Sequence, residues 1–86
     1  MKVRISSPLQ SYTKGLTSIE LLGSTLADVI NELDKKFPGI KFRFIDEQDR
    51  IRPHMRIFVD GQIISDLNMV IQKNANVYIV HLISGG

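Results

Sequence analysis

The chain contains no cysteine and no long apolar run. Without cysteine it has no disulfide, no thiolate ligand for a zinc or iron–sulfur site and no thiol nucleophile. Its longest apolar stretch, Val77–Leu82, is interrupted by His81 and is far shorter than the ~20 residues of a transmembrane helix. The segment Met1–Leu9 is charged and then polar, unlike the apolar part of a signal peptide. We therefore expect a cytoplasmic protein without a membrane partner.

The chain also has little excess of positive over negative charge, with 11 Lys and Arg against 9 Asp and Glu and a net charge of +2. A basic stretch covers residues 43–56, but acidic residues lie among its arginines and no aromatic platform accompanies it. We interpret this stretch as a solvated loop with local ion pairs and expect no nucleic-acid partner. The two histidines, His54 and His81, are far apart and have no companion cluster, so we expect no metal site.

The clearest element is a helix between Thr25 and Phe37. Apolar residues recur at the spacing of one helical stripe, at Leu26, Val29, Ile30, Leu33 and Phe37. Thr25 (or Ser24) can cap the start, and Asp28 stands at the capping-box position relative to Thr25. Pro38-Gly39 ends the helix.

Strands are predicted on both sides of this helix. Alternating or β-branched segments occur at Lys2–Ser6, Thr17–Leu22, Met55–Val59, Gln62–Ile64 and Val77–Ile83. Asp60-Gly61 predicts a tight turn, Ser7–Gly15 a polar turn-forming loop, and Ile40–Asp46 one helical turn on the core. The order predicts an α+β, β-grasp fold: a mixed sheet of four or five strands with one main helix packed across one face.

The same alternation predicts which side chains the helix leaves uncovered. Met55, Ile57 and Val59 should point inward, and the next residues along each strand should point outward. The outward set is Arg56, Phe58, Tyr78, Val80 and Leu82, which is unusually apolar for an open sheet face. Such a patch often marks a partner contact, so we expect a docking face here. A register shifted by one residue, or a loop covering the patch, would remove it.

Gly85-Gly86 closes the sequence directly after the last predicted strand. Glycine loses the most backbone freedom on ordering, so two in a row add nothing to a core. A bare diglycine can instead thread a narrow channel and carry its carboxylate to another protein's active site. We expect one domain over residues 1–86, with a flexible tail at 84–86 formed by Ser84, Gly85 and Gly86.

Three segments match a known family in the same order over about the whole chain. They are the capped helix Thr25–Phe37 with Pro38-Gly39-Ile40, then Ile57–Gly61, and then Val77–Ile83 leading into Ser84-Gly85-Gly86. With these segments the chain resembles the MoaD/ThiS-type ubiquitin-like sulfur carrier family, which includes the small subunit of molybdopterin synthase, the thiamine sulfur carrier and the cysteine-pathway carrier CysO. The loop Asp46–His54 is closer to the cysteine-pathway type. Two departures are Lys73–Asn76, where an acidic turn is common, and Ser84, where alanine is frequent.

The resemblance implies that the chain is a protein cosubstrate rather than an enzyme, although it could be the small subunit of a molybdopterin synthase. An activating enzyme would use ATP to adenylate the Gly86 carboxylate, and a sulfurtransferase or sulfide would convert it to a thiocarboxylate. A biosynthetic enzyme would then accept the sulfur. Among the alternative pathways we rank cysteine or homocysteine synthesis first, molybdenum cofactor synthesis second, and tRNA thiolation or thiamine synthesis third. The chain itself would need no cofactor.

Two alternatives remain open from the residues. A ubiquitin-like modifier would use the same activated Gly86 carboxyl group to join lysine amines of target proteins. A structural β-grasp binding domain would carry the diglycine only by chance.

Overall fold

The computed structural model describes residues 1–82 of the chain. The predicted tail residues Ser84, Gly85 and Gly86 lie outside the described residues, and so does Ile83 at the end of the last predicted strand. Predictions about these four positions therefore stay predictions.

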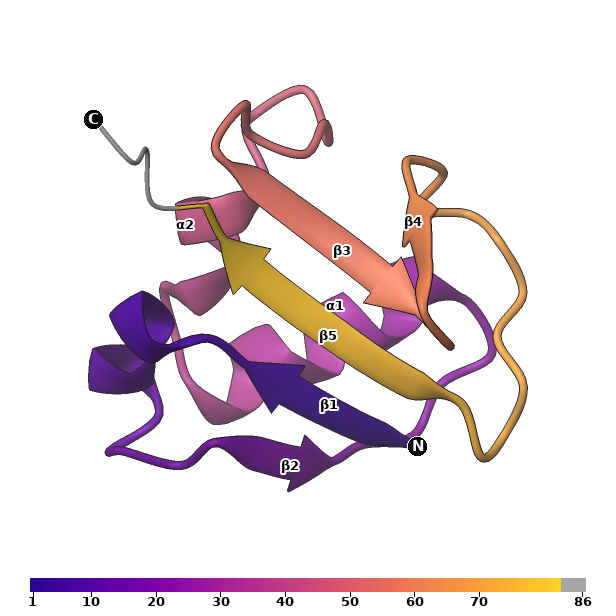
Figure 1. Ribbon diagram of the computed structural model, residues 1–86, viewed down its shortest axis with the longest axis horizontal. Coiled ribbons are helices and arrows are strands. Elements are labelled where there is room, and N and C mark those ends of the chain that lie inside the picture. Colours follow the sequence, from indigo (N-terminus) through magenta and orange to yellow (C-terminus); the bar gives the residue numbers. More distant parts are fainter. Residues whose placement is uncertain (83–86) are drawn as a thin grey trace.

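The predicted mixed sheet has five strands in the order β2-β1-β5-β3-β4 (Figure 1). The strands are β1 Lys2–Ile5, β2 Ser18–Glu20, β3 Met55–Val59, β4 Gln62–Ile64 and β5 Asn76–His81. β5 lies in the centre, parallel to β1 and antiparallel to β3. The outer pairs, β1 with β2 and β3 with β4, are antiparallel hairpins. In the second hairpin both turn residues have a positive φ, 49° at Asp60 and 86° at Gly61, as a tight turn of the predicted kind requires.

The helix α1 Leu26–Lys36 begins with the predicted capping box. The Thr25 hydroxyl oxygen accepts from the Asp28 backbone N–H at 3.2 Å, and the Asp28 carboxylate accepts from the Thr25 N–H at 3.2 Å. The next free N–H groups reach a distant loop: Leu26 donates to the Met69 carbonyl and Ala27 to the Leu67 carbonyl. Because these bonds join the helix start to the loop after β4, they fix how α1 crosses the sheet.

Two short helices complete the covered side. The predicted helical turn is present as α2 Ile40–Phe44, and the Asp34 carboxylate accepts from the Gly39 and Lys41 N–H groups at its start. The predicted polar loop at Ser7–Gly15 is instead a 3-10 helix, η1 Ser7–Tyr12. Pro8 favours a helical start there, and Leu9 becomes a core residue with 3% exposure.

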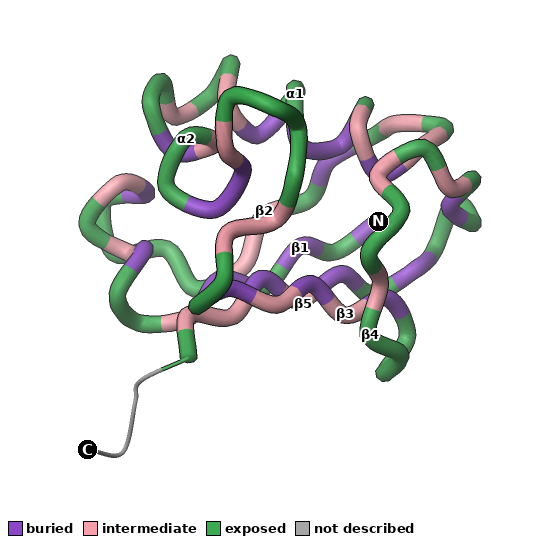
Figure 2. Tube along the Cα trace, turned by 90° about the horizontal axis from the view of Figure 1, so that it is seen from above, coloured by how far each residue is buried: buried purple, intermediate pink, exposed green. Residues whose placement is uncertain are grey.

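Both α-helices lie on the same side of the sheet, and along the three central strands buried residues alternate with exposed ones in β1 and mainly with half-buried ones in β3 and β5 (Figure 2). Met55, Ile57 and Val59 of β3 are buried, and so are Val77 and Ile79 of β5, as the alternation predicted. The register is therefore the expected one, and the opposite face of the sheet is left open. Within residues 1–82, no helix has the length and apolar character that crossing a membrane requires.

Candidate functional site

The open face of the sheet carries a row of side chains that crosses four strands. Residues that pair directly across neighbouring strands share a face, and the pairs run from Arg4 to Tyr78, from Tyr78 to Phe58 and from Phe58 to Ile63. Val80 lies on the same face, paired with Arg56. We call these six residues the open face: Arg4, Arg56, Phe58, Ile63, Tyr78 and Val80.

The centre of the open face is apolar. Phe58, Tyr78 and Val80 are half-buried, whereas Ile63 at the edge strand is 64% exposed. Leu82 follows β5 on the same alternation and is 40% exposed. A domain of this size has few apolar side chains to spare for its surface, so this grouping supports the predicted docking face.

Two arginines on the open face are held in place without an acidic partner. Arg56 donates from Nη1 to the carbonyls of Met55 at 2.7 Å and Pro53 at 2.9 Å. The Arg4 guanidinium lies over the Tyr78 ring, 4.6 Å from its centroid. Within residues 1–82 neither guanidinium lies within 4.0 Å of a carboxylate. These positive charges are therefore fixed in position and still available to a negatively charged partner.

The end of β5 is clamped from both sides. The Leu82 N–H donates to the His54 carbonyl at 2.7 Å, and the His81 N–H donates to the Ser6 hydroxyl oxygen at 2.9 Å. The Ser6 N–H in turn donates to the Ile79 carbonyl at 3.0 Å. The chain is thus held up to Leu82 by residues adjoining β1 and β3.

The neighbouring His81 was assigned no function from the sequence. Its Nδ1 atom is buried and has no hydrogen-bond partner in residues 1–82. Its position alternates with Val80 and Leu82, so the imidazole lies on the helix side of the sheet and not on the open face.

Two carboxylates with lowered pKa values, Asp28 and Asp46, accept hydrogen bonds from backbone N–H groups. The N–H groups of Thr25 and Ser24 lower the pKa of Asp28. The N–H of Arg50 lowers the pKa of Asp46 most, helped by the Gln48 N–H and nearby arginine charges. Both carboxylates cap local structure on the helix side. No group of three or more metal-ligating side chains occurs in the part of the chain described, residues 1–82.

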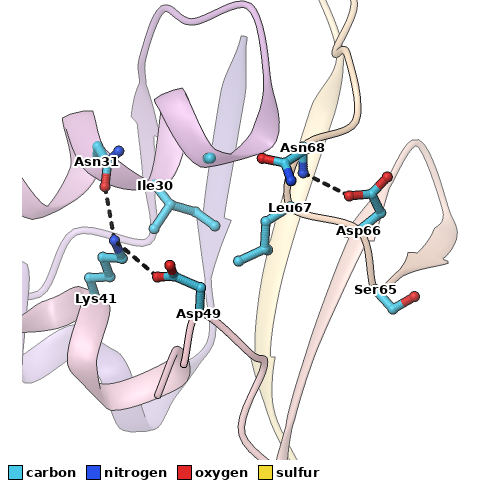
Figure 3. Close-up of a pocket in the computed structure, with 9 residues that line it drawn as sticks. Ile30, Asn31, Lys41, Asp49, Ser65, Asp66, Leu67 and Asn68 are labelled. Atoms are coloured by element: carbon cyan, nitrogen blue, oxygen red, sulfur yellow. Dashed lines mark hydrogen bonds and ion pairs between the residues drawn. The ribbon is translucent and has the colours of Figure 1, made fainter. Parts of the chain in front are cut away.

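A pocket of about 320 Å³ opens on the helix side, between α1, α2 and the loop after β4 (Figure 3). Its polar groups satisfy one another: Lys41 Nζ donates to Asn31 Oδ1 at 3.1 Å and lies 3.9 Å from Asp49 Oδ1. The Asn68 N–H donates to the Asp66 carboxylate at 2.9 Å. The pocket is thus lined largely by paired surface groups, and none of the predicted docking or tail residues lines it.

The structure brings the predicted docking residues together, because Arg56, Phe58, Tyr78 and Val80 share one face and Leu82 continues it. Two further residues of this face, Arg4 and Ile63, were not among the predicted docking residues. Their neighbours on the face depend on the strand order, which was not predicted.

The basic stretch at 43–56 has the predicted local ion pairing. Arg50 Nε lies 3.6 Å from Asp46 Oδ2. Arg52 is instead stacked on the Phe42 ring, 4.5 Å from its centroid, and donates to the Phe42 carbonyl.

Comparison with known proteins identifies both a family and a fold. A protein-family model described as the ThiS family matches residues 3–86. No curated protein matches the chain. Among solved structures, a chain of the BexX/CysO complex of Amycolatopsis orientalis has a TM-score of 0.91 at 23% identity, over 99% of this chain and 98% of that one.

Two further solved structures are similar to the chain. CysO of Mycobacterium tuberculosis, described as an antigen, has a TM-score of 0.88 at 25% identity, over 95% of this chain and 98% of that chain. SAMP1 of Haloferax volcanii has a TM-score of 0.78 at 16% identity, over 99% and 97%. These neighbours confirm the predicted β-grasp, ubiquitin-like fold.

Proposed function

The chain belongs to the ThiS family, and we propose that it works as a sulfur carrier of this family through a thiocarboxylate on Gly86. It acts as a protein cosubstrate and not as an enzyme. The family match carries this conclusion, since it extends through residue 86 and so includes Ser84, Gly85 and Gly86.

The chemistry needs an activated acyl group. A carboxylate is a poor electrophile, so a Gly86 oxygen first attacks the α-phosphate of ATP and pyrophosphate leaves. The resulting acyl-AMP has a good leaving group. Hydrosulfide (HS⁻) then attacks the carbonyl carbon, the bond to AMP breaks and AMP leaves, which forms the thiocarboxylate and releases the proton of the hydrosulfide. ATP is a substrate of the activating enzyme, and the carrier itself needs no cofactor.

The arrangement of the described residues supports this use of the chain. β5 is clamped up to Leu82, so a partner that grips the sheet also fixes where the following residues begin. The open face offers Phe58, Val80 and Leu82 as apolar contacts beside that point. Partner enzymes of sulfur transfer would use this face in turn: the activating enzyme, a sulfurtransferase and a sulfur acceptor.

Among acceptor pathways we place cysteine or homocysteine synthesis first and the molybdenum cofactor second. The two CysO structures, with TM-scores of 0.91 and 0.88, favour the first.

A reconstituted adenylation assay tests the proposal. The full chain, ATP and the activating enzyme from the same host should yield an acyl-AMP on Gly86, and adding sulfide should convert it to a thiocarboxylate, both detected by intact mass. The chain lacking Gly86 is the matched control and should yield neither. If the full chain gives no acyl-AMP with any adenylating enzyme of its host, the proposal is refuted.

The likeness to SAMP1, a small archaeal modifier protein, favours a second candidate. A protein modifier would transfer the activated Gly86 carboxyl group to lysine amines. Digests of host proteins would then contain lysines carrying a remnant of the chain's last residues, and deletion of the gene would remove them. A carrier that serves only biosynthesis would leave no such remnants.

A further inference from the structure

A shallow hollow of about 300 Å³ lies beside the apolar part of the open face, where β1, β2 and the start of η1 meet. Two cations line it, Lys2 and Arg4, together with the Tyr78 ring. Hydroxyl groups from the loop and strand beside them complete the wall, at Ser7, Thr17 and Ser18. None of the residues that line it is acidic.

Arg4 is prepared for an anion before any partner arrives. Stacking on Tyr78, 4.6 Å from the ring centroid, restricts the side chain and leaves the guanidinium N–H groups free at the edge of its plane. A carboxylate fits that edge with two parallel hydrogen bonds. Since the side chain is already ordered, less conformational entropy is lost when the pair forms.

Glu20, the cross-strand neighbour of Lys2, forms no ion pair with either cation of the hollow. Glu20 pairs with Lys2 across β1 and β2, but its carboxylate lies 3.5 Å from the N-terminal ammonium nitrogen of Met1. That side chain is 79% exposed. Within residues 1–82, neither Lys2 nor Arg4 has a carboxylate oxygen within 4.0 Å.

The hollow is also continuous with the apolar contacts. Tyr78 pairs with Arg4 on one side and with Phe58 on the other, so an occupant of the hollow and an apolar group on Phe58 would be close neighbours. A charged anchor next to a desolvated aromatic centre is the arrangement that fixes orientation in protein interfaces.

We propose that this hollow receives an aspartate or glutamate side chain of the activating enzyme, which pairs with Arg4 and orients the carrier on that enzyme. The inference rests on the proposed function, because it names a contact made during activation of Gly86. The carboxylate comes from the enzyme because the hollow adjoins the docking contacts that lead to the clamped end of β5.

The test measures the Kd of the full chain for the activating enzyme at low and moderate salt. Arg4→Gln should weaken binding by about tenfold or more at low salt, as expected for a charge-assisted hydrogen-bonded pair, and should flatten the salt dependence. Arg4→Lys keeps the charge but loses the planar guanidinium, so its Kd should lie between those of the wild type and Arg4→Gln. The matched control is Arg50→Gln, which makes the same charge change at an exposed, ion-paired loop position on the helix side. Its Kd should stay within about twofold of the wild-type value.

Two further measurements separate the possible failures. Thermal unfolding checks that each variant folds, and single-turnover acyl-AMP formation at enzyme concentrations above Kd should be the same for all of them. If the wild-type chain forms no acyl-AMP, the proposed function fails. If it does, and Arg4→Gln binds as tightly as Arg50→Gln, only the hollow's role is refuted.

A second copy of the chain is the competing occupant, since Glu20 is an exposed carboxylate at the edge strand. Sedimentation would then show a wild-type dimer that Arg4→Gln dissociates, with an unchanged Kd for the enzyme. That result would overturn the inference. The inference would be supported if the wild-type chain sedimented as a monomer at all concentrations used and Arg4→Gln bound the enzyme more weakly.

Discussion

Replacing Phe58 by alanine should weaken docking while leaving the fold intact. Phe58 lies on the open face between Tyr78 and Ile63 and takes no part in the buried core cluster. Truncation therefore removes apolar surface that a partner would cover, and it creates no cavity inside the domain.

The size of the effect follows from the area involved. An aromatic side chain offers about 150–250 Å² to burial, and a half-buried one leaves roughly 50 Å² of that for a partner to cover. Phe58 would also cover apolar area on the partner, which truncation leaves exposed. At about 25 cal/mol per Å² for both surfaces, docking should lose about 1–2 kcal/mol. That corresponds to about a 5- to 30-fold increase in Kd.

The cost to folding should be of similar size or smaller. Phe58 has two cross-strand partners, Tyr78 and Ile63, and such pairs contribute about 0.2–1 kcal/mol each, so Tm should fall by roughly 2–15 °C without loss of the fold.

The assay compares kcat/KM and kcat for adenylation by the activating enzyme. Phe58→Ala should lower kcat/KM by the same 5- to 30-fold and leave kcat nearly unchanged, because the Phe58 side chain stabilises the bound state and the transition state equally. The matched control is Phe42→Ala, the same truncation at a side chain that is 55% exposed on α2, on the helix side. If both variants weakened adenylation equally, or if Phe58→Ala had no effect, the open face would not be the docking surface.

Three other outcomes are expected. Val80→Asp places a carboxylate opposite Arg56 and should reduce enzyme binding at least as strongly as Phe58→Ala, with a stability loss of about 1 kcal/mol in urea unfolding; unchanged binding would contradict this. One residue added after Gly86 should abolish acyl-AMP formation and shift Tm by less than about 2 °C, since the diglycine is expected to add nothing to the core; a sharply lower Tm would contradict this. Hydrogen bonds from the N–H groups of Thr25 and Ser24 lower the pKa of Asp28 in the folded state. The contribution of the Asp28 carboxylate to stability is therefore complete above its unfolded pKa of 3.8, and it is lost as the pH falls through the lower folded pKa. The free energies of unfolding of wild type and Asp28→Asn, measured in urea, should therefore converge at low pH. A difference in unfolding free energy that persisted at low pH would contradict this.

Local patterns were sufficient for most of the fold. The capping box at Thr25 and Asp28 uses residues three positions apart, and the turn at Asp60-Gly61 needs only two adjacent residues with positive φ. The inward and outward faces of β3 follow from simple alternation and the burial of Ile57 confirms them.

Features that depend on distant parts of the chain were not predictable in the same way. The helix η1 is short, and its one core residue, Leu9, is buried by packing that no local period announces. Arg4 lies next to the apolar centre of the open face only because β1 lies parallel beside β5, a pairing between residues more than seventy positions apart. The hollow beside it could not have been predicted without the strand order.

The most direct test of the account is the intact mass of the protein purified from its native host under conditions that preserve thiocarboxylates. A carrier in use should show a fraction of molecules heavier by the difference between one sulfur and one oxygen atom, and fragmentation should place that difference on Gly86. A protein that carries only an unmodified Gly86 carboxylate while its host is actively using sulfide would contradict the claim that this chain carries sulfur.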